Sequence, residues 1–160
     1  MPSSPDIRPF RESDTDAMAA WLTASEPWRT LGYRTNDWAP YFSAVAADPL
    51  READVIESEG AAAGVAVVRR HVLAGDYLEL FAIAPSARRV GLGRAFLDYV
   101  ERRAFSRARN FYLCVSDFNT AARAFYRAAG YQEIGPIDEL IVPGRSEVLM
   151  RKTIGPMRQP

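Results

Sequence analysis

The chain has very few of the residues that build disulfides and metal sites. Its 160 residues include one cysteine, Cys114, and one histidine, His71. A single cysteine cannot close a disulfide within the chain, and neither residue is present twice, as most Cys and His metal sites require. We therefore expect no metal site.

The chain also lacks an excess charge and a long apolar run. Lys plus Arg and Asp plus Glu both number 20, so the formal net charge is zero. A general nucleic-acid or anionic-membrane binder normally carries a basic excess. No run approaches the ~20 apolar residues of a membrane span, and the N-terminal "MPSSPDIRPF" has no apolar core of a secretory signal. We expect a cytoplasmic protein that binds neither nucleic acid nor membranes.

What is present is an ordinary globular composition, with 48% hydrophobic and 25% charged residues. This length suits one domain over residues 1–160. Alternation and helical periodicity predict strands over 6–10, 52–60, 62–72, 77–85, 110–116, 131–134 and 146–153, and helices over 13–27, 37–49, 91–108 and 119–130. This order predicts an α/β (α+β) fold with a mixed sheet, antiparallel in its first half and covered by helices on both faces.

Two glycines, Gly91 and Gly93, follow a strand that stops at Pro85 and precede a helix. A nucleotide-triphosphate loop would need a Lys-Ser/Thr pair after the second glycine, and the chain has Arg94-Ala95 there. A dinucleotide fingerprint would need a third small residue where Phe96 stands, so that interpretation is weak.

What remains is a helix N-terminus whose free N–H groups and glycines favour an approaching phosphate. Arg88, Arg89 and Arg94 surround it with guanidinium groups suited to a diphosphate. From this stretch alone, a tight turn with a solvated arginine rim stays an open alternative.

Two motifs together resemble the GNAT superfamily of N-acetyltransferases. "PSARRVGLG" is similar to the acyl-CoA pattern Arg/Gln-x-x-Gly-x-Gly/Ala, and "NTAARAFYRAAGY" is similar to the second signature Asn-x-x-Ala…Tyr-x-x-x-Gly-Phe/Tyr. The matching positions are Arg88, Gly91 and Gly93 in the first motif, and Asn119, Ala122, Tyr126, Gly130 and Tyr131 in the second. The resemblance implies a single GNAT-like domain of about seven strands, with a splayed cofactor cleft between the fourth and fifth. It also implies an acceptor-side part over 1–74, a CoA-binding part over 75–135 and C-terminal strands over 131–153.

The resemblance implies acetyl-CoA as cofactor. Backbone groups at Ala82 and Ile83 would pair with the pantetheine arm, Asn119 would hydrogen-bond it, and the turn would hold the pyrophosphate. The implied cofactor-binding residues are Ala82, Ile83, Arg88, Arg89, Val90, Gly91, Leu92, Gly93, Arg94, Asn119 and Tyr126.

Tyr126 is, by the same resemblance, the acid that protonates the departing thiolate. A tyrosine of pKa about 10 can donate to a thiolate of pKa about 8.5 when it is within reach. The alternative is a core aromatic on the inner face of a helix.

Glu79 is the candidate general base. Strand alternation places it on the same side as Phe81 and Ile83, and a carboxylate on so apolar a strand needs a use or a partner. A structural pairing with an arginine is the alternative. Some members of the family carry an acidic residue at the place of Cys114, which leaves Glu79, or no side-chain base. We expect Cys114 to be a small apolar residue of a buried strand.

The acceptor pocket, by the resemblance, is shaped by the segment "SEPWRTLGYRTNDWAPYF" between the first two helices. Its aromatic residues Trp28, Tyr33 and Trp38 are candidate substrate-binding residues, with packing under a lid as the alternative. We predict an N-acetyltransferase that moves an acetyl group from acetyl-CoA to a small amine or peptide in a ternary complex. A non-catalytic acyl-CoA-binding module is the main alternative, and a homodimer stays open.

Overall fold

A seven-stranded mixed sheet of order β1-β2-β3-β4-β5-β7-β6 organises the computed structural model, which describes residues 5–160. The strands are β1 (Asp6–Pro9), β2 (Arg51–Ser58), β3 (Ala61–Val72), β4 (Gly75–Ile83), β5 (Asn110–Ser116), β6 (Gln132–Asp138) and β7 (Ser146–Thr153). The helices are α1 (Thr15–Thr23), α2 (Trp38–Ala47), α3 (Leu92–Phe105) and α4 (Thr120–Ala128), with single 3-10 turns η1 (Glu12–Asp14), η2 (Thr35–Asp37) and η3 (Pro85–Ala87).

The strand directions confirm the mixed sheet. β1 to β4 pair antiparallel, β4 and β5 pair parallel, and β7 pairs antiparallel with both β5 and β6. The parallel pair is connected through α3, as parallel strands need a crossover of helical length.

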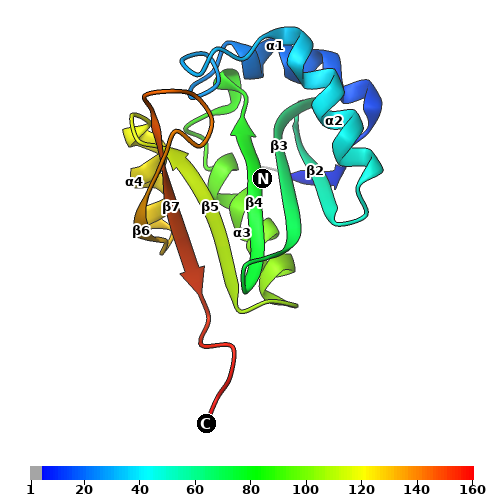
Figure 1. Cartoon of the computed structure of the whole chain (residues 1–160). Helices are drawn as coiled ribbons and strands as arrows, with labels where there is room; N and C mark the ends of the chain where they lie inside the picture. The colour runs from blue at the N-terminus through cyan, green and yellow to red at the C-terminus, as the bar shows by residue number, and fades with distance from the viewer. Residues whose placement is uncertain (1–4) are drawn as a thin grey trace.

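Helices cover both faces of the sheet, α1 and α2 on one face and α3 and α4 on the other (Figure 1). Each face has its own apolar core, because alternate residues of one strand point to opposite faces. The α3–α4 core includes Leu78, Phe96, Leu113, Val148 and Met150. The α1–α2 core includes Met18, Trp38, Phe42, Val55 and Leu80. No helix within residues 5–160 is long and apolar enough to cross a bilayer.

The two central strands separate along their length. β4 and β5 are paired only from Asp76 to Leu78 on one strand and from Phe111 to Leu113 on the other. Beyond these residues both strands continue toward the same end of the sheet and diverge (Figure 1). The predicted splay between the fourth and fifth strands is confirmed, and it leaves one edge of β4 without a neighbouring strand.

A bulge lies where the separation begins. Leu78 pairs with Val68 and Leu80 pairs with Val67, so Glu79 is an extra residue in β4. An extra residue reverses the facing of the side chains on its two sides. Leu78 therefore packs in the α3–α4 core, and Leu80 packs in the α1–α2 core.

Gly64 of β3 lets the end of β4 lie close. A Cβ at this glycine would stand 2.6 Å from Cδ1 of Ile83 and 2.9 Å from the carbonyl oxygen of Ala82. The absence of a side chain here fixes the position of the two residues predicted to pair with pantetheine.

Candidate active site

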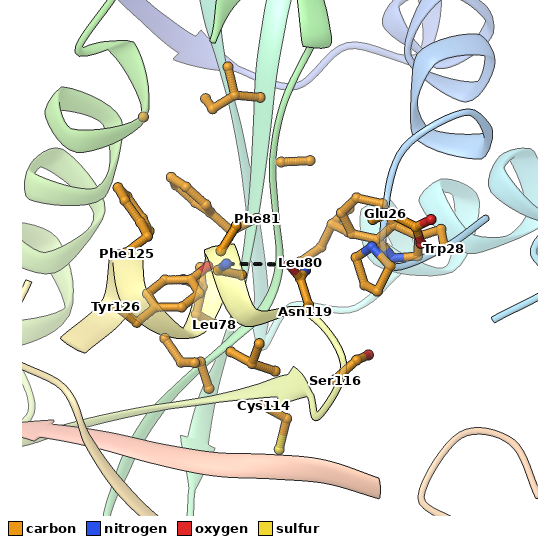
Figure 2. Close-up of a pocket in the computed structure, with 18 of the residues that line it drawn as sticks. Glu26, Trp28, Leu78, Leu80, Phe81, Cys114, Ser116, Asn119, Phe125 and Tyr126 are labelled. Atoms are coloured by element: carbon orange, nitrogen blue, oxygen red, sulfur yellow. Dashed lines mark hydrogen bonds between the residues drawn. The ribbon is translucent and has the colours of Figure 1, made fainter. Parts of the chain in front are cut away.

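A cavity of about 710 Å³ opens where β4 and β5 part. Figure 2 shows Phe125 and Tyr126 of α4 on one side and Glu26 and Trp28 on the opposite side. The cavity reaches both faces of the sheet, because the gap between the strands passes through it. Eleven of the predicted site residues line it: Trp28, Glu79, Ala82, Ile83, Arg88, Arg89, Gly91, Gly93, Arg94, Asn119 and Tyr126.

The glycine turn ends in the N-terminus of α3. Gly91 is the N-cap residue with φ +79° and ψ 1°, a left-handed conformation that glycine adopts without strain. No atom lies within 4 Å of where its Cβ would be, so a ligand can approach the backbone. The first N–H groups of the helix, which include those of Leu92 and Gly93, have no acceptor within the helix. An anion is the favoured partner at such a terminus.

Arg88, Arg89 and Arg94 all line the cavity near this terminus. Nε of Arg88 donates to the carbonyl oxygen of Ile83 at 3.0 Å, which ties the turn to the end of β4. Nε of Arg94 donates to Oδ1 of Asp98 at 2.9 Å. The side chain of Val90 is 76% exposed and that of Leu92 packs against the α3–α4 core, so only their backbone is available to a ligand in the cavity.

Asn119 is the N-cap residue of α4. Its side-chain oxygen accepts a hydrogen bond from the backbone N–H of Ala122 at 3.3 Å, drawn as the dashed line in Figure 2. That bond leaves the amide nitrogen as a donor for a ligand. Across the cavity, the edge of β4 around Ala82 and Ile83 has no neighbouring strand. Apart from the carbonyl of Ile83, which accepts from Arg88, its outward backbone groups are open to an extended molecule, in the way that an exposed strand edge accepts another strand.

Tyr126 is both a core residue and a wall of the cavity. Its ring packs edge-on against Phe125 at 5.2 Å and Tyr131 at 5.5 Å between ring centroids, and the residue is 8% exposed. Burial alone raises the pKa of its hydroxyl. A phenol with a raised pKa stays protonated at neutral pH, and it holds its proton more tightly than a phenol in water does.

Glu79 does not lie where alternation predicts. The bulge turns it away from Phe81 and Ile83 and toward β2 and β3, where its Oε1 accepts from Arg51 at 2.9 Å and lies 3.9 Å from Arg69. The predicted facing is wrong because the alternation of a strand breaks at an extra residue. Glu79 lines the cavity from the α1–α2 face as an ion-paired carboxylate.

Tyr41 of α2 lies beside this carboxylate. Burial and the charge of Glu79 raise the pKa of its hydroxyl. Among the described residues, neither this hydroxyl nor Oε2 of Glu79 has a hydrogen-bond partner, although both atoms are buried. The two groups are close enough to influence each other, and Glu79 thus has both a cationic and a phenolic neighbour on this face.

Of the three predicted substrate-binding aromatics, Trp28 alone lines the cavity. Trp38 is 2% exposed, and its Nε1 donates to Oγ1 of Thr23 at 3.1 Å, so it is a core residue of the α1–α2 face. Tyr33 stacks on Trp38 at 5.4 Å and Trp28 packs edge-on against it at 5.8 Å. Packing against the buried Trp38 thus holds in place the segment from which Trp28 reaches the cavity.

The C-terminal end of β5 and the N-terminal end of β7 contribute cavity residues that sequence reasoning missed. Ser116 of β5 is paired in register with Glu147 of β7, and both line the cavity with Cys114. Leu140 and Ile141 line it from the loop that joins β6 to β7. An acidic residue opening the apolar strand "SEVLM" was the one available signal, of the same kind that singled out Glu79.

Cys114 is only half-buried and lies on the cavity wall, where we expected a buried apolar residue. Burial raises the pKa of its thiol, and the charge of Glu147 adds to the increase. A thiol with a raised pKa is a poor nucleophile at neutral pH.

The acetyltransferase (GNAT) family model matches residues 15–131, which contain the splayed strands, the glycine turn and Tyr126. The chain belongs to this family. It is therefore an acyl-CoA-dependent acetyltransferase, and the predicted cofactor, acetyl-CoA, is the one that the family uses.

Solved structures of other GNAT enzymes share the fold at low sequence identity. An acetyltransferase from Thermus thermophilus superimposes with a TM-score of 0.79 at 19% identity, over 94% of this chain and 97% of that one. The ribosomal-protein-S18-alanine N-acetyltransferase from Escherichia coli gives 0.77 at 20% identity, over 97% of both chains. A phosphinothricin acetyltransferase from Sinorhizobium meliloti, in complex with acetyl-CoA, gives 0.74 at 17% identity, over 98% of this chain and 93% of that one. No curated protein sequence matches the chain significantly.

Proposed function

We propose that this GNAT enzyme transfers the acetyl group of acetyl-CoA directly to a primary amine within a ternary complex. The observation that carries the proposal is a continuous cavity that passes between β4 and β5. An anion-binding helix terminus and Tyr126 lie on its α3–α4 side, and carboxylates and Trp28 lie on the other. Two substrates that enter from opposite faces would meet between the strands.

The donor side fits a long molecule with a diphosphate at one end. The N-terminus of α3, with Arg88 and Arg89, would hold the diphosphate. The free edge of β4 and the amide of Asn119 would hold the arm that leads to the thioester. Tyr126 would then donate its proton to the sulfur as the carbon–sulfur bond breaks.

Direct transfer is favoured over a route through an acetylated cysteine. The raised pKa of Cys114 disfavours its thiolate, and His71, the one histidine of the chain, lies at the opposite end of β4, beside Asp76. An amine acceptor also agrees with the acidic groups on the acceptor side and with the N-acetyltransferases among the relatives.

The test is thiol release from acetyl-CoA against a panel of primary amines and short peptides, with secondary amines and alcohols as controls. Turnover with primary amines and acetylated nitrogen in the product, seen by mass spectrometry, are expected. CoA that stabilises the protein without any turnover would support instead a module that only binds acyl-CoA.

The order of transfer is tested separately by varying both substrates. Intersecting double-reciprocal plots, together with retained activity in Cys114→Ala, are expected for a ternary complex. Parallel plots and an acetyl group found on Cys114 would contradict direct transfer.

A further inference from the structure

Glu147 differs from every other buried carboxylate of the described residues. Five carboxylates are buried, and four of them are ion-paired. The pairs are Asp14 with Arg8, Asp54 with Arg103, Asp76 with Arg107, and Glu101 with Lys152. Glu147 is 4% exposed and has no lysine or arginine within 4.0 Å among residues 5–160. Its one hydrogen-bond partner there is Oγ of Ser116, which donates to Oε1 at 2.6 Å.

A buried carboxylate without a cation is costly, since one hydroxyl does not replace the lost hydration. Such a group is expected to be protonated or to receive a positive charge from a ligand. Burial does raise the pKa of Glu147, and the nearby Asp117 adds to the increase. Glu147 lines the cavity, so a ligand can reach it.

Glu147 lies on the α1–α2 face of the sheet, which is the proposed acceptor side of the cavity. In β7, Val148 and Met150 point into the α3–α4 core. Because side chains alternate along a strand, the side chain of Glu147 points to the opposite face. Its charge contributes to the raised pKa of Tyr77, Cys114 and Tyr33, from β4, β5 and the segment between α1 and α2. The carboxylate thus lies near β4, β5 and the segment between α1 and α2.

The other two carboxylates of the cavity are already neutralised. Glu26 pairs with Arg29 at 2.6 Å, and Glu79 pairs with Arg51 at 2.9 Å. Glu147 is therefore the one carboxylate without a cationic partner among the described carboxylates that line the cavity.

We propose that Glu147, held by Ser116, binds the ammonium group of the acceptor and removes its proton. This rests on the proposed function and names the base for it. The ammonium proton passes to Glu147, the nitrogen then forms a bond to the thioester carbon, and the carbon–sulfur bond breaks. The sulfur takes the proton of Tyr126, the nitrogen returns its second proton to that tyrosine, and Glu147 releases its own to solvent. The balance is an ammonium and acetyl-CoA giving an amide, CoA and one proton.

The surroundings define the acceptor class. Trp28 and Leu31 on one side and Leu140 and Ile141 on the other line the cavity, and the last two are about half exposed. An apolar group next to the amine would cover them. A carboxylate on the carbon that bears the amine would approach Glu147 and be repelled. The acceptor class is therefore a primary amine beside an apolar group and without an adjacent carboxylate.

The experiment compares Glu147→Gln with wild type, using phenethylamine and the peptide amide Leu-Ala-NH2 as acceptors and free leucine as the carboxylate-bearing control. Asp117→Asn is the matched variant, because this exposed carboxylate also acts on Glu147 but does not line the cavity. Glu147→Gln is expected to lower kcat/KM near neutral pH by about a hundredfold, the scale of general base catalysis. Asp117→Asn is expected to stay within about threefold of wild type, as is usual for a surface change.

A pH profile separates proton removal from mere positioning. Above neutral pH, the activity of Glu147→Gln should rise about tenfold per pH unit until the acceptor's own pKa, because solvent then supplies the free amine. Activity of Glu147→Gln within about threefold of wild type would overturn the inference.

Binding of the acceptors to the CoA-loaded protein, followed by NMR, gives a readout independent of turnover. Binding of phenethylamine to wild type, weakened about tenfold or more in Glu147→Gln, supports the ammonium site even where no turnover is seen. Binding of neither acceptor to wild type, or unchanged binding in the variant, overturns it. Absence of turnover in wild type, by contrast, bears on the proposed function.

Discussion

The two sides of the cavity are built in different ways. The donor side is made of contiguous stretches of chain: the end of β4, the glycine turn and the first turns of α3 and α4. The acceptor side takes single side chains from the segment between α1 and α2, from β5, and from the loop and strand around β7. Under the proposed function, the backbone groups of the donor side would hold acetyl-CoA, and the separate side chains of the acceptor side would select the amine.

The largest effect is expected from a change in the backbone of the donor side. Gly91→Val places a β-branched residue at φ +79° and a side chain in the space over the α3 terminus. We expect acetyl-CoA affinity to fall about a hundredfold or more, since the N–H groups at this terminus can no longer be reached. Isothermal titration with CoA measures it.

Gly60→Val is the matched control for strain. Gly60 has φ +77° in the turn between β2 and β3, with no atom within 4 Å of where its Cβ would be, and it does not line the cavity. Both variants should lose similar stability, about 1–2 kcal/mol, because both force a left-handed conformation. Equal loss of CoA affinity in both variants would mean that backbone strain, and not access to the N-terminus of α3, governs CoA binding.

Removal of the proposed acid tests the point where the two sides meet. Tyr126→Phe is expected to lower kcat about a hundredfold with little change in CoA affinity. Tyr131→Phe is the control. The hydroxyl of Tyr131 is buried without a hydrogen-bond partner among the described residues, and its ring packs against Tyr126, but the residue does not line the cavity. Unchanged turnover in Tyr126→Phe would remove this tyrosine as the acid.

On the acceptor side, Trp28 and Trp38 should separate binding from folding. Trp28→Ala is expected to raise the KM for phenethylamine about tenfold and to leave the KM for acetyl-CoA unchanged, because an apolar contact of this size is worth roughly 1–2 kcal/mol. Trp38→Ala should instead cost about 3–5 kcal/mol of unfolding free energy, measured by urea denaturation. A shift of acetyl-CoA KM in Trp28→Ala would show that the donor and acceptor sides are not separate.

The same contrast explains what the sequence could predict. The order of strands and helices followed from alternation and periodicity, and the donor side followed from two motifs whose glycines and N-caps act locally. The sequence singled out Glu79, but the predicted direction of its side chain was wrong. Nothing in "YLELFAI" marks Glu79 as the extra residue that the pairing with β3 reveals. Glu147 was missed because its neighbour Ser116 lies 31 residues away and its lack of a cation is a property of the fold.

Trp28 and Trp38 also show that the sequence alone does not separate a cavity residue from a core residue. Trp28 and Trp38 look alike in an aromatic-rich segment, and sequence reasoning assigned both to the substrate. The helical position of Trp38, with Phe42 and Val45 on the same buried face of α2, puts it in the core. Trp28 precedes that helix and is free to face the cavity.

The smallest effect concerns the stability of the acceptor side and isolates the charge on Glu147. Because its pKa in the folded protein is raised above the ordinary 4.5, the native state holds this proton more tightly than the unfolded chain. Its contribution is thus fully present below the ordinary pKa and is lost as pH rises through the raised value. Glu147→Gln keeps an acceptor for Ser116 and has no charge to bury, so its Tm relative to wild type should increase from about the ordinary glutamate pKa upward and then level off.

A gain of about 2–4 °C corresponds to roughly 1 kcal/mol in a chain of this size, and calorimetry across the pH range resolves it. Asp117→Asn removes the nearby charge that disfavours ionised Glu147, so it should show a smaller gain of the same sign. A Tm difference that is flat with pH in Glu147→Gln would mean that the carboxylate is solvated in the folded protein. The contrast between one unpaired and several paired carboxylates would then lose its energetic meaning.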